Sequence, residues 1–379
     1  MKTILIILVL LGALSIIVNR WDKISFKNIE YKRYLDKERV FINEKVKMTT
    51  EIVNRKLLPL PWIEVRAEIP NEFILKDQKV TMINEKSKKI YRVITSLISF
   101  QRIKRYNTLY CNKRGYYSVY DTKLSIGDIF GFATAEKYIS YPMVLIVYPE
   151  IKPLEKLVVR NNGLQGEVSV KRWIIPDNTE VIGAREYTSS DSFNAIDWKT
   201  TARVGNLYVK KFDFTADPSI VTILNVQTSK VHWQDVKTDI IEKGIDLIAA
   251  ITQKAINEKI SIGYTSNAYF NGENQELFIE PRIGLSQKTI ILEALAKTSY
   301  TRRISIEELF KSKIKCFSFK STIVLLTAYI SDGLRTELNY YAKHGYRIKL
   351  ILLDSSVEVN SLVKNIEVLL CSDLVESAR

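Results

Sequence analysis

The feature of this chain that most constrains its fold is a change in the spacing of apolar residues near residue 216. In the amino-terminal part, apolar side chains recur at every second position, as in Lys45–Ile52 and Trp62–Ile69. From Ser219 onward, short apolar runs alternate with longer amphipathic stretches such as Asp235–Lys259. The first pattern is typical of half-buried strands, and the second of an α/β domain. A chain of 379 residues also exceeds what one core normally serves, so we expect several domains.

The period-two part predicts a small β-sandwich over residues 25–155. Further strand-like runs follow the first two, and they are separated by turn residues and prolines; they are Lys89–Ser96, Arg105–Cys111 and Tyr116–Leu124. Several short antiparallel strands within one segment favour two sheets packed face to face.

The alternating part predicts a doubly wound α/β domain over residues 216–379. Strands are expected at Ser219–Val226, Ile260–Thr265, Glu276–Glu280, Thr322–Ala328, Tyr346–Leu353 and Asn365–Cys371. Helices are expected at Asp235–Lys259, Ser286–Thr298 and Gly333–His344. The predicted fold class is therefore α+β and multidomain, with residues 156–215 as a connecting segment.

An uncharged apolar run, Thr3–Asn19, predicts a transmembrane anchor within residues 1–20. It is close to the lower limit of the roughly 17–25 residues that cross a bilayer as a helix. A signal peptide is the alternative, but Ala13 and Ser15 lie inside the run rather than after it, and Arg20 follows it directly. Basic residues are more frequent after the run than before it, so the positive-inside rule predicts a single-pass protein of the cell membrane with a cytoplasmic body.

Composition excludes several functional classes. Three cysteines lie far apart and only two histidines are present, so the sequence favours neither a disulfide framework nor a zinc site or a histidine-based triad. The net charge of +14 permits a nucleic acid, an anionic lipid or an acidic protein as partner. No known nucleic-acid-binding motif accompanies this charge, so we expect no nucleic-acid partner and no cofactor.

The richest motif is the segment 185–213, REYTSSDSFNAIDWKTTARVGNLYVKKFD. Its order of residues resembles the signature of the domain of unknown function 58 family, which reads R-E-Y, G-D, R-x-I-D-W-K-x-x-A-R and L-x-V-K. Ser190 and Asn194 depart from the family's usual Gly and Arg. The matching positions that we take as candidate site residues are Arg185, Glu186, Tyr187, Asp191, Asp197, Trp198, Lys199 and Arg203.

Three interpretations of this motif are open. Paired carboxylates beside guanidinium groups are one pattern of acid–base catalysis. The spacing instead indicates a short helix, in which Trp198 and Ala202 share one face and Lys199 and Arg203 share the next. Such a helix fits either a packed tryptophan in a salt-bridged linker or a partner-binding face.

The family resemblance implies a membrane-anchored protein with a von Willebrand factor type A-like domain at its carboxyl end. Such domains often hold a divalent ion through D-x-S-x-S after the first strand and a later Asp after the fourth. Here the corresponding positions are Asn225, Gln227, Ser229 and Ala328. Because hard cations prefer anionic oxygen ligands, and both carboxylates are missing, we expect no bound metal.

The resemblance also implies an association with MoxR-type AAA ATPases and other type A domain proteins. The expected role is a non-enzymatic membrane-anchored scaffold or adaptor, which contacts lipid through its anchor and presents a protein partner to such an ATPase. The alternative is an outward-facing, adhesin-like binding protein.

Overall fold

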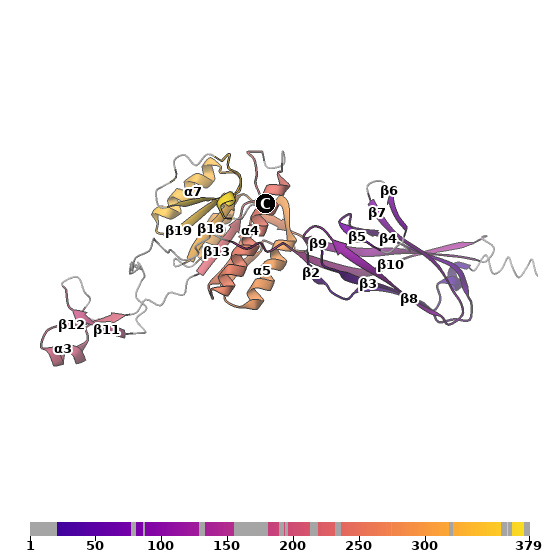
Figure 1. Ribbon diagram of the computed structural model, residues 1–379, viewed down its shortest axis with the longest axis horizontal. Helices are drawn as coiled ribbons and strands as arrows, with labels where there is room; N and C mark the ends of the chain where they lie inside the picture. Colours follow the sequence, from indigo (N-terminus) through magenta and orange to yellow (C-terminus); the bar gives the residue numbers. More distant parts are fainter. Residues whose placement is uncertain are drawn as a thin grey trace, which may run out of the picture. The chain divides into compact units, whose positions relative to one another are not determined.

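The computed structural model describes residues 21–76, 81–85, 88–128, 133–154, 181–188, 193, 196–212, 219–231, 236–273, 275–317, 321–357, 362 and 366–374 (Figure 1). These residues form two compact units. Unit 1 comprises the described residues up to Ile151 together with two later segments, Phe270–Gln275 and Leu292–Ser299, and unit 2 comprises the rest.

Unit 1 is built from two sheets, preceded by the short helix α2 (Trp21–Ser25). The four-stranded sheet has the order β1 (Ile29–Leu35), β3 (Val46–Asn54), β8 (Arg102–Cys111), β5 (Phe73–Leu75). The six-stranded sheet has the order β2 (Arg39–Phe41), β10 (Thr134–Tyr148), β9 (Gly115–Gly127), β4 (Leu60–Ile69), β7 (Lys88–Leu97), β6 (Thr81–Glu85). Except for the parallel pair β2–β10, neighbouring strands run antiparallel.

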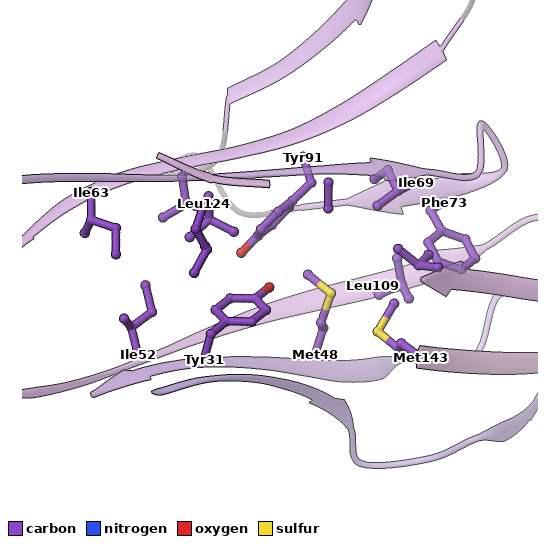
Figure 2. Close-up of a cluster of buried hydrophobic side chains, with 14 of the residues drawn as sticks. Tyr31, Met48, Ile52, Ile63, Ile69, Phe73, Tyr91, Leu109, Leu124 and Met143 are labelled. Carbon is purple, nitrogen blue, oxygen red and sulfur yellow. The ribbon is translucent and has the colours of Figure 1, made fainter. Parts of the chain in front are cut away.

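The hydrophobic core of unit 1 lies between these sheets. Alternation along β3 points Val46, Met48 and Ile52 inward, and all three are buried. Figure 2 shows side chains of the two sheets facing one another, with Ile63 and Leu124 on the sheet opposite Ile52. The period-two pattern of the sequence therefore corresponds to strands that bury one face each.

A buried arginine in the amino-terminal part of unit 1 contacts a segment of the same unit that comes much later in the sequence. Arg114, which precedes β9, donates from Nη1 to the carbonyl oxygens of Leu295 at 2.8 Å, Ala296 at 3.4 Å and Thr298 at 2.9 Å. The Leu295 and Ala296 carbonyls belong to the last turn of α5 (Leu285–Lys297), where backbone acceptors lack partners within the helix, and Thr298 directly follows that helix. The guanidinium group thus caps that end.

Unit 2 contains a six-stranded sheet with the order β16 (Phe278–Arg282), β14 (Ser261–Ser266), β13 (Ser219–Leu224), β18 (Ser321–Thr327), β19 (Arg347–Leu352), β20 (Glu367–Leu370). Its strands pair in parallel except for β16, which is antiparallel to β14. Other elements are β15 (Ala268–Phe270) paired with β17 (Thr298–Arg302), the helices α4 (Thr238–Asn257), α6 (Ile306–Lys313) and α7 (Asp332–Lys343), and the single 3₁₀ turns η2 (Ile314–Cys316) and η3 (Cys371–Asp373).

Helices cover this sheet through apolar side chains. Leu309 and Phe310 of α6 and Leu334 of α7 share a core with Val221 and Ile223 of β13. Helix α4 packs through Gly244, where an added Cβ would lie 2.8 Å from Leu353 and 2.9 Å from Leu224. The amphipathic helices that the sequence predicts thus bury their apolar faces against the central strands.

The predicted fold class is wrong. Strands predominate over helices in the described residues, and we find no doubly wound α/β domain of the von Willebrand factor type A kind. Among the described residues, single helices connect successive parallel strands in β13–α4–β14 and β18–α7–β19. Between β14 and β18 the chain instead forms three further strands beside α5 and α6. Apolar runs predict buried strands, but they do not predict how those strands are connected.

The predicted single-pass location in a membrane is also corrected. Within the part of the chain that the structure describes, no helix is both long and apolar enough to cross a bilayer. Even α4, with 20 residues, carries charges along its length, among them Asp239, Lys243 and Asp246. The run Thr3–Asn19, on which the prediction rested, lies outside the described residues.

Candidate functional site

The signature residues form a small module of unit 2. Strands β11 (Val181–Glu186) and β12 (Tyr208–Phe212) pair antiparallel, with Arg185 opposite Val209, and the helix α3 (Trp198–Val204) lies beside β12 (Figure 1). Ile196 also bridges to Val209. Ile196 and Val209 are both buried, and they supply the apolar contacts that hold this module together.

Asp197 begins the helix of this module. Its Oδ1 accepts from the backbone nitrogens of Lys199 at 3.1 Å and Thr200 at 3.3 Å, and its Oδ2 accepts from the Thr200 hydroxyl at 2.8 Å. These hydrogen bonds, the Thr200 hydroxyl first among them, hold the pKa of the Asp197 carboxyl below its ordinary value. The carboxylate is therefore an N-cap, which satisfies backbone donors that a helix start leaves open.

The end of α3 is equally well defined. Gly205 has φ +83°, a left-handed conformation that glycine adopts at little cost, and its nitrogen donates to the Thr201 carbonyl at 2.9 Å. The Thr201 hydroxyl then accepts from the Tyr208 nitrogen at 3.0 Å, which ties the helix to β12. The predicted short helix exists, and its cap residues Asp197 and Gly205 stand directly before and after its seven residues.

The tryptophan of the motif is exposed, which favours the interpretation as a partner-binding face over that as a packed tryptophan. Trp198 is 65% exposed, and none of the residues of α3 is buried. Phe193 at 70% and Val204 at 53% are also largely exposed, and so is Leu207. Large apolar side chains that gather on one small module without burial are typical of a binding surface.

The other signature positions have these surroundings. Arg185 Nη1 donates to the Glu186 carbonyl at 3.1 Å, and the ring of Tyr187 lies 6.0 Å from that of Phe193. Lys199 and Arg203 lie on α3. Asp191 lies outside the described residues.

At the carboxyl ends of β13, β14 and β18, the structure brings together a closed network of side chains. Asn225 donates to the Thr327 hydroxyl at 3.0 Å, and its Oδ1 accepts from Asn267 at 2.9 Å and from the Gln227 nitrogen at 3.1 Å. Asn225, Asn267 and Thr327 are all buried. Each hydrogen-bonding atom of the Asn225 amide is therefore occupied by a protein group.

The remaining positions of the degenerate metal motif are also hydrogen-bonded or buried. Gln227 donates to the Ser229 carbonyl at 2.9 Å and accepts from Arg302 Nη1 at 2.9 Å, and the Ser229 hydroxyl donates to the Val231 carbonyl at 2.9 Å. Ala328 is buried next to Thr327. Among the described residues, no group of three or more His, Cys, Asp or Glu side chains could hold a metal ion.

Sequence reasoning missed Asn267, Thr327 and Arg302. Asn267 directly follows one parallel strand and Thr327 ends another. Because the carboxyl ends of neighbouring parallel strands meet at one edge, this placement is a signal that could have identified both. The position of Arg302 depends on the pairing of β15 with β17, which no local pattern indicates.

A cavity of about 530 Å³ in unit 2 is a weaker candidate. It lies between α4 and the ends of β19 and β20, and its lining mixes cations with carboxylates. Asp246 pairs with Lys152 at 3.6 Å and Asp354 with Lys237 at 3.1 Å. Since these carboxylates already have partners, the cavity does not select one ligand chemistry, and the signature module is the better candidate.

Comparisons with known proteins agree with the motif. The family model "Protein of unknown function DUF58" matches residues 183–356, which include the signature module except for its first two residues, and most of unit 2. "Uncharacterized protein YeaD" of Bacillus subtilis (strain 168) is 20% identical over 245 residues, or 63% of this chain and 56% of that protein. The match thus spans little more than half the length of that relative.

Solved structures resemble only part of the chain. A non-cellulosomal cohesin from Archaeoglobus fulgidus matches with a TM-score of 0.23 and 11% identity over 31% of this chain and 91% of the cohesin. The full-length major pilin SpaD from Corynebacterium diphtheriae matches with a TM-score of 0.28 and 8% identity over 35% of this chain and 39% of the pilin. Similarity at this level supports no statement on fold or function.

Proposed function

We propose that this chain is a non-enzymatic adaptor that binds a protein partner through its signature module. The observation that carries the proposal is the exposure of Trp198 on a helix whose two ends are fixed by Asp197 and Gly205. A rigid, exposed tryptophan is the kind of side chain that dominates binding energy at protein interfaces.

The charges of the module favour an acidic partner. Lys199 and Arg203 lie on the same helix as Trp198, and Lys210 lies on the neighbouring strand β12. The first turn of α3 contains no acidic residue, and Asp197 is already engaged by the helix start. A partner segment that combines apolar side chains with Asp or Glu would therefore complement this surface.

The same contacts speak against catalysis by the motif. A general base needs a lone pair that is directed at its substrate. Both carboxylate oxygens of Asp197 instead accept hydrogen bonds from the first turn of α3. The lowered pKa of this carboxyl follows from the same hydrogen bonds, so it reflects capping rather than acid–base chemistry.

The partner that the family resemblance suggests is a MoxR-type AAA ATPase, or another protein of the machinery associated with it. We test this with the purified full-length chain and the purified ATPase from the same cell. Trp198→Ala is expected to weaken binding at least tenfold, measured by biolayer interferometry, because hot-spot truncations cost about 2 kcal/mol or more.

Leu57→Ala is the matched control, since Leu57 is an apolar side chain of unit 1 that is at least as exposed as Trp198. It is expected to leave the affinity unchanged. If the wild-type chain does not bind the ATPase, that partner is wrong. If it binds and Trp198→Ala binds equally well, the signature module is not the contact surface.

A further inference from the structure

The interior of unit 1 contains a charged side chain, Arg33, for which the described residues supply no counterion. On β1, alternation points Tyr31 and Arg33 inward, while Lys32 and Tyr34 are exposed. Arg33 is only 1% exposed. None of its three guanidinium nitrogens has a hydrogen-bond partner among the described residues, although together they carry five N–H donors.

The surroundings of Arg33 are hydroxyl groups of both sheets. Arg33 lies opposite Thr50 in the β1–β3 register, and the Thr50 hydroxyl lies 3.3 Å from that of Tyr91. Tyr91 donates to Asn107 Oδ1 at 3.2 Å. Figure 2 shows Tyr31 and Tyr91 reaching from facing sheets with their hydroxyl groups directed toward each other.

Two further hydroxyl groups have hydrogen-bonding capacity to spare. The Tyr31 and Thr122 side chains are buried neighbours from opposite sheets; burial raises the Tyr31 pKa, and the nearby Thr122 hydroxyl acts to lower it against that larger effect. Within the described residues, neither hydroxyl has a hydrogen-bond partner at a suitable distance and angle. Both can therefore donate to a group placed between the sheets.

No described carboxylate neutralises this cluster. The buried acids of unit 1, Glu51 and Glu64, each pair with two cations already: Glu51 with Arg102 and Lys104, and Glu64 with Arg66 and Arg92. Because side chains alternate along a strand, Glu51 and Glu64 also lie on the outer face of their sheets. Their neighbours along the strands face inward; these are Thr50, Ile52, Ile63 and Val65.

The phenols do not supply the missing negative charge. Burial raises the pKa of both Tyr31 and Tyr91, so both stay neutral donors at ordinary pH. Arg105 is a second cation, beside Arg33, whose charge acts to lower the Tyr91 pKa against the larger effect of burial. The interior therefore has an excess of positive charge, which is costly in a medium of low polarity.

We propose that unit 1 binds a small inorganic anion of the size of chloride between its two sheets, on the guanidinium group of Arg33 and the hydroxyl groups of Tyr31 and Thr122. A buried water could accept hydrogen bonds from the same donors, but it would leave the charge uncompensated. Facing sheets are only about 10 Å apart, and this spacing limits the anion to a small one.

The test measures the melting temperature of the full chain at constant ionic strength while chloride replaces gluconate, an anion too large for the interior. Ligand that binds only the folded state stabilises it in proportion to the logarithm of its concentration. We expect a rise of about 3 °C for each tenfold increase in chloride above the dissociation constant. Arg33→Met, which keeps the length and removes the charge, is expected to abolish this rise.

Arg55→Met is the control, because Arg55 is an exposed arginine that pairs with Glu30 of the same strand β1. It should retain the full chloride response. A second measurement does not depend on any variant: crystals soaked in bromide should show an anomalous peak beside the Arg33 guanidinium group. An equal response of wild type and Arg33→Met, or the absence of that peak, would mean that the interior holds only water and would overturn the proposal.

Discussion

Asn267 Nδ2 donates to Asn225 Oδ1 at 2.9 Å, and this bond links the ends of two adjacent parallel strands, β13 and β14. Asn267 also accepts from the Val226 nitrogen at 3.0 Å, so the two amides fix the backbone that leaves β13. Asn225, the position compared above with the aspartate of a metal-binding motif, is thus part of a neutral, fully paired network.

The first prediction follows from this pairing. Asn225→Asp replaces the amide group that donates to Thr327 with a charged oxygen in a buried place. We expect a loss of about 3 kcal/mol in the free energy of unfolding at neutral pH, measured by urea denaturation. Burial raises the pKa of such a carboxyl, so stability should partly return as the pH falls through that raised value. An unchanged stability at neutral pH would contradict the closed network.

The second prediction concerns two glycines in strands. An added Cβ at Gly263 of β14 would lie 2.5 Å from the Ile279 carbonyl oxygen of β16, whereas nothing lies within 4 Å of one at Gly183 of β11. Gly263→Ala should therefore destabilise the chain by about 2 kcal/mol through overpacking. Gly183→Ala is the matched control and should leave the melting temperature of the chain nearly unchanged.

The third prediction separates binding from stability in the signature module. Trp198→Ala should not lower stability, since the side chain is exposed. Val209→Ala should lower the stability of the module, because Val209 is buried against Ile196. The hydrogen-exchange rates of the β11–β12 amides measure the stability of the module in both variants. If Trp198→Ala accelerated this exchange as much as Val209→Ala, the tryptophan would have a packing role.

The fourth prediction concerns the cap of α3. Asp197→Ala should accelerate hydrogen exchange at the amides of Lys199 and Thr200 severalfold, whereas Asp197→Asn should preserve much of the protection, because asparagine is also a good N-cap. The Asp197 pKa is lowered, so its contribution is present above the unfolded-state pKa and is lost as the pH falls through the folded-state value. Equal exchange in the alanine variant and the wild type would exclude the capping role.

The fifth prediction concerns Asp354, which accepts from the Ser356 nitrogen at 3.0 Å, its hydroxyl at 2.8 Å and Lys237 at 3.1 Å. The hydrogen bonds from Ser356, followed by that from Lys237, lower its pKa to about 2. The stability that this carboxylate contributes should be constant near neutral pH and be lost between about pH 4 and pH 2. Carboxyl chemical shifts measure the midpoint, and Lys237→Met should move it upward.

Much of the local structure could be predicted from the sequence. The apolar run at Ser219–Val226 and the amphipathic stretch at Asp235–Lys259 correspond to β13 and α4 within three residues at each end. Both patterns are local, and the burial of one face determines them. The fold class was wrong because it depends on long-range connections, such as the pairing of β15 with β17, that local periodicity does not encode.

The candidate site was predicted less well. The helix at Trp198 follows from residue spacing, but its exposure does not, because the same i, i+4 pattern describes a packed face and a binding face. The inward-facing Arg33 also escaped prediction. An arginine in the alternating pattern of a strand is normally assigned to the solvent side, and only the burial of Tyr31 on the same face shows otherwise.

The three hydrogen bonds of Arg114 have a consequence for biosynthesis. The acceptors at Leu295, Ala296 and Thr298 are translated long after the strands that surround this arginine. While the ribosome is still adding these residues, the guanidinium group has to stay hydrated, so the first unit cannot reach its final structure until Ser299 has left the exit tunnel. A nascent chain released after Ile151 would therefore expose the Arg114 environment to chaperones and proteases, although every strand of both sheets would already have been synthesised.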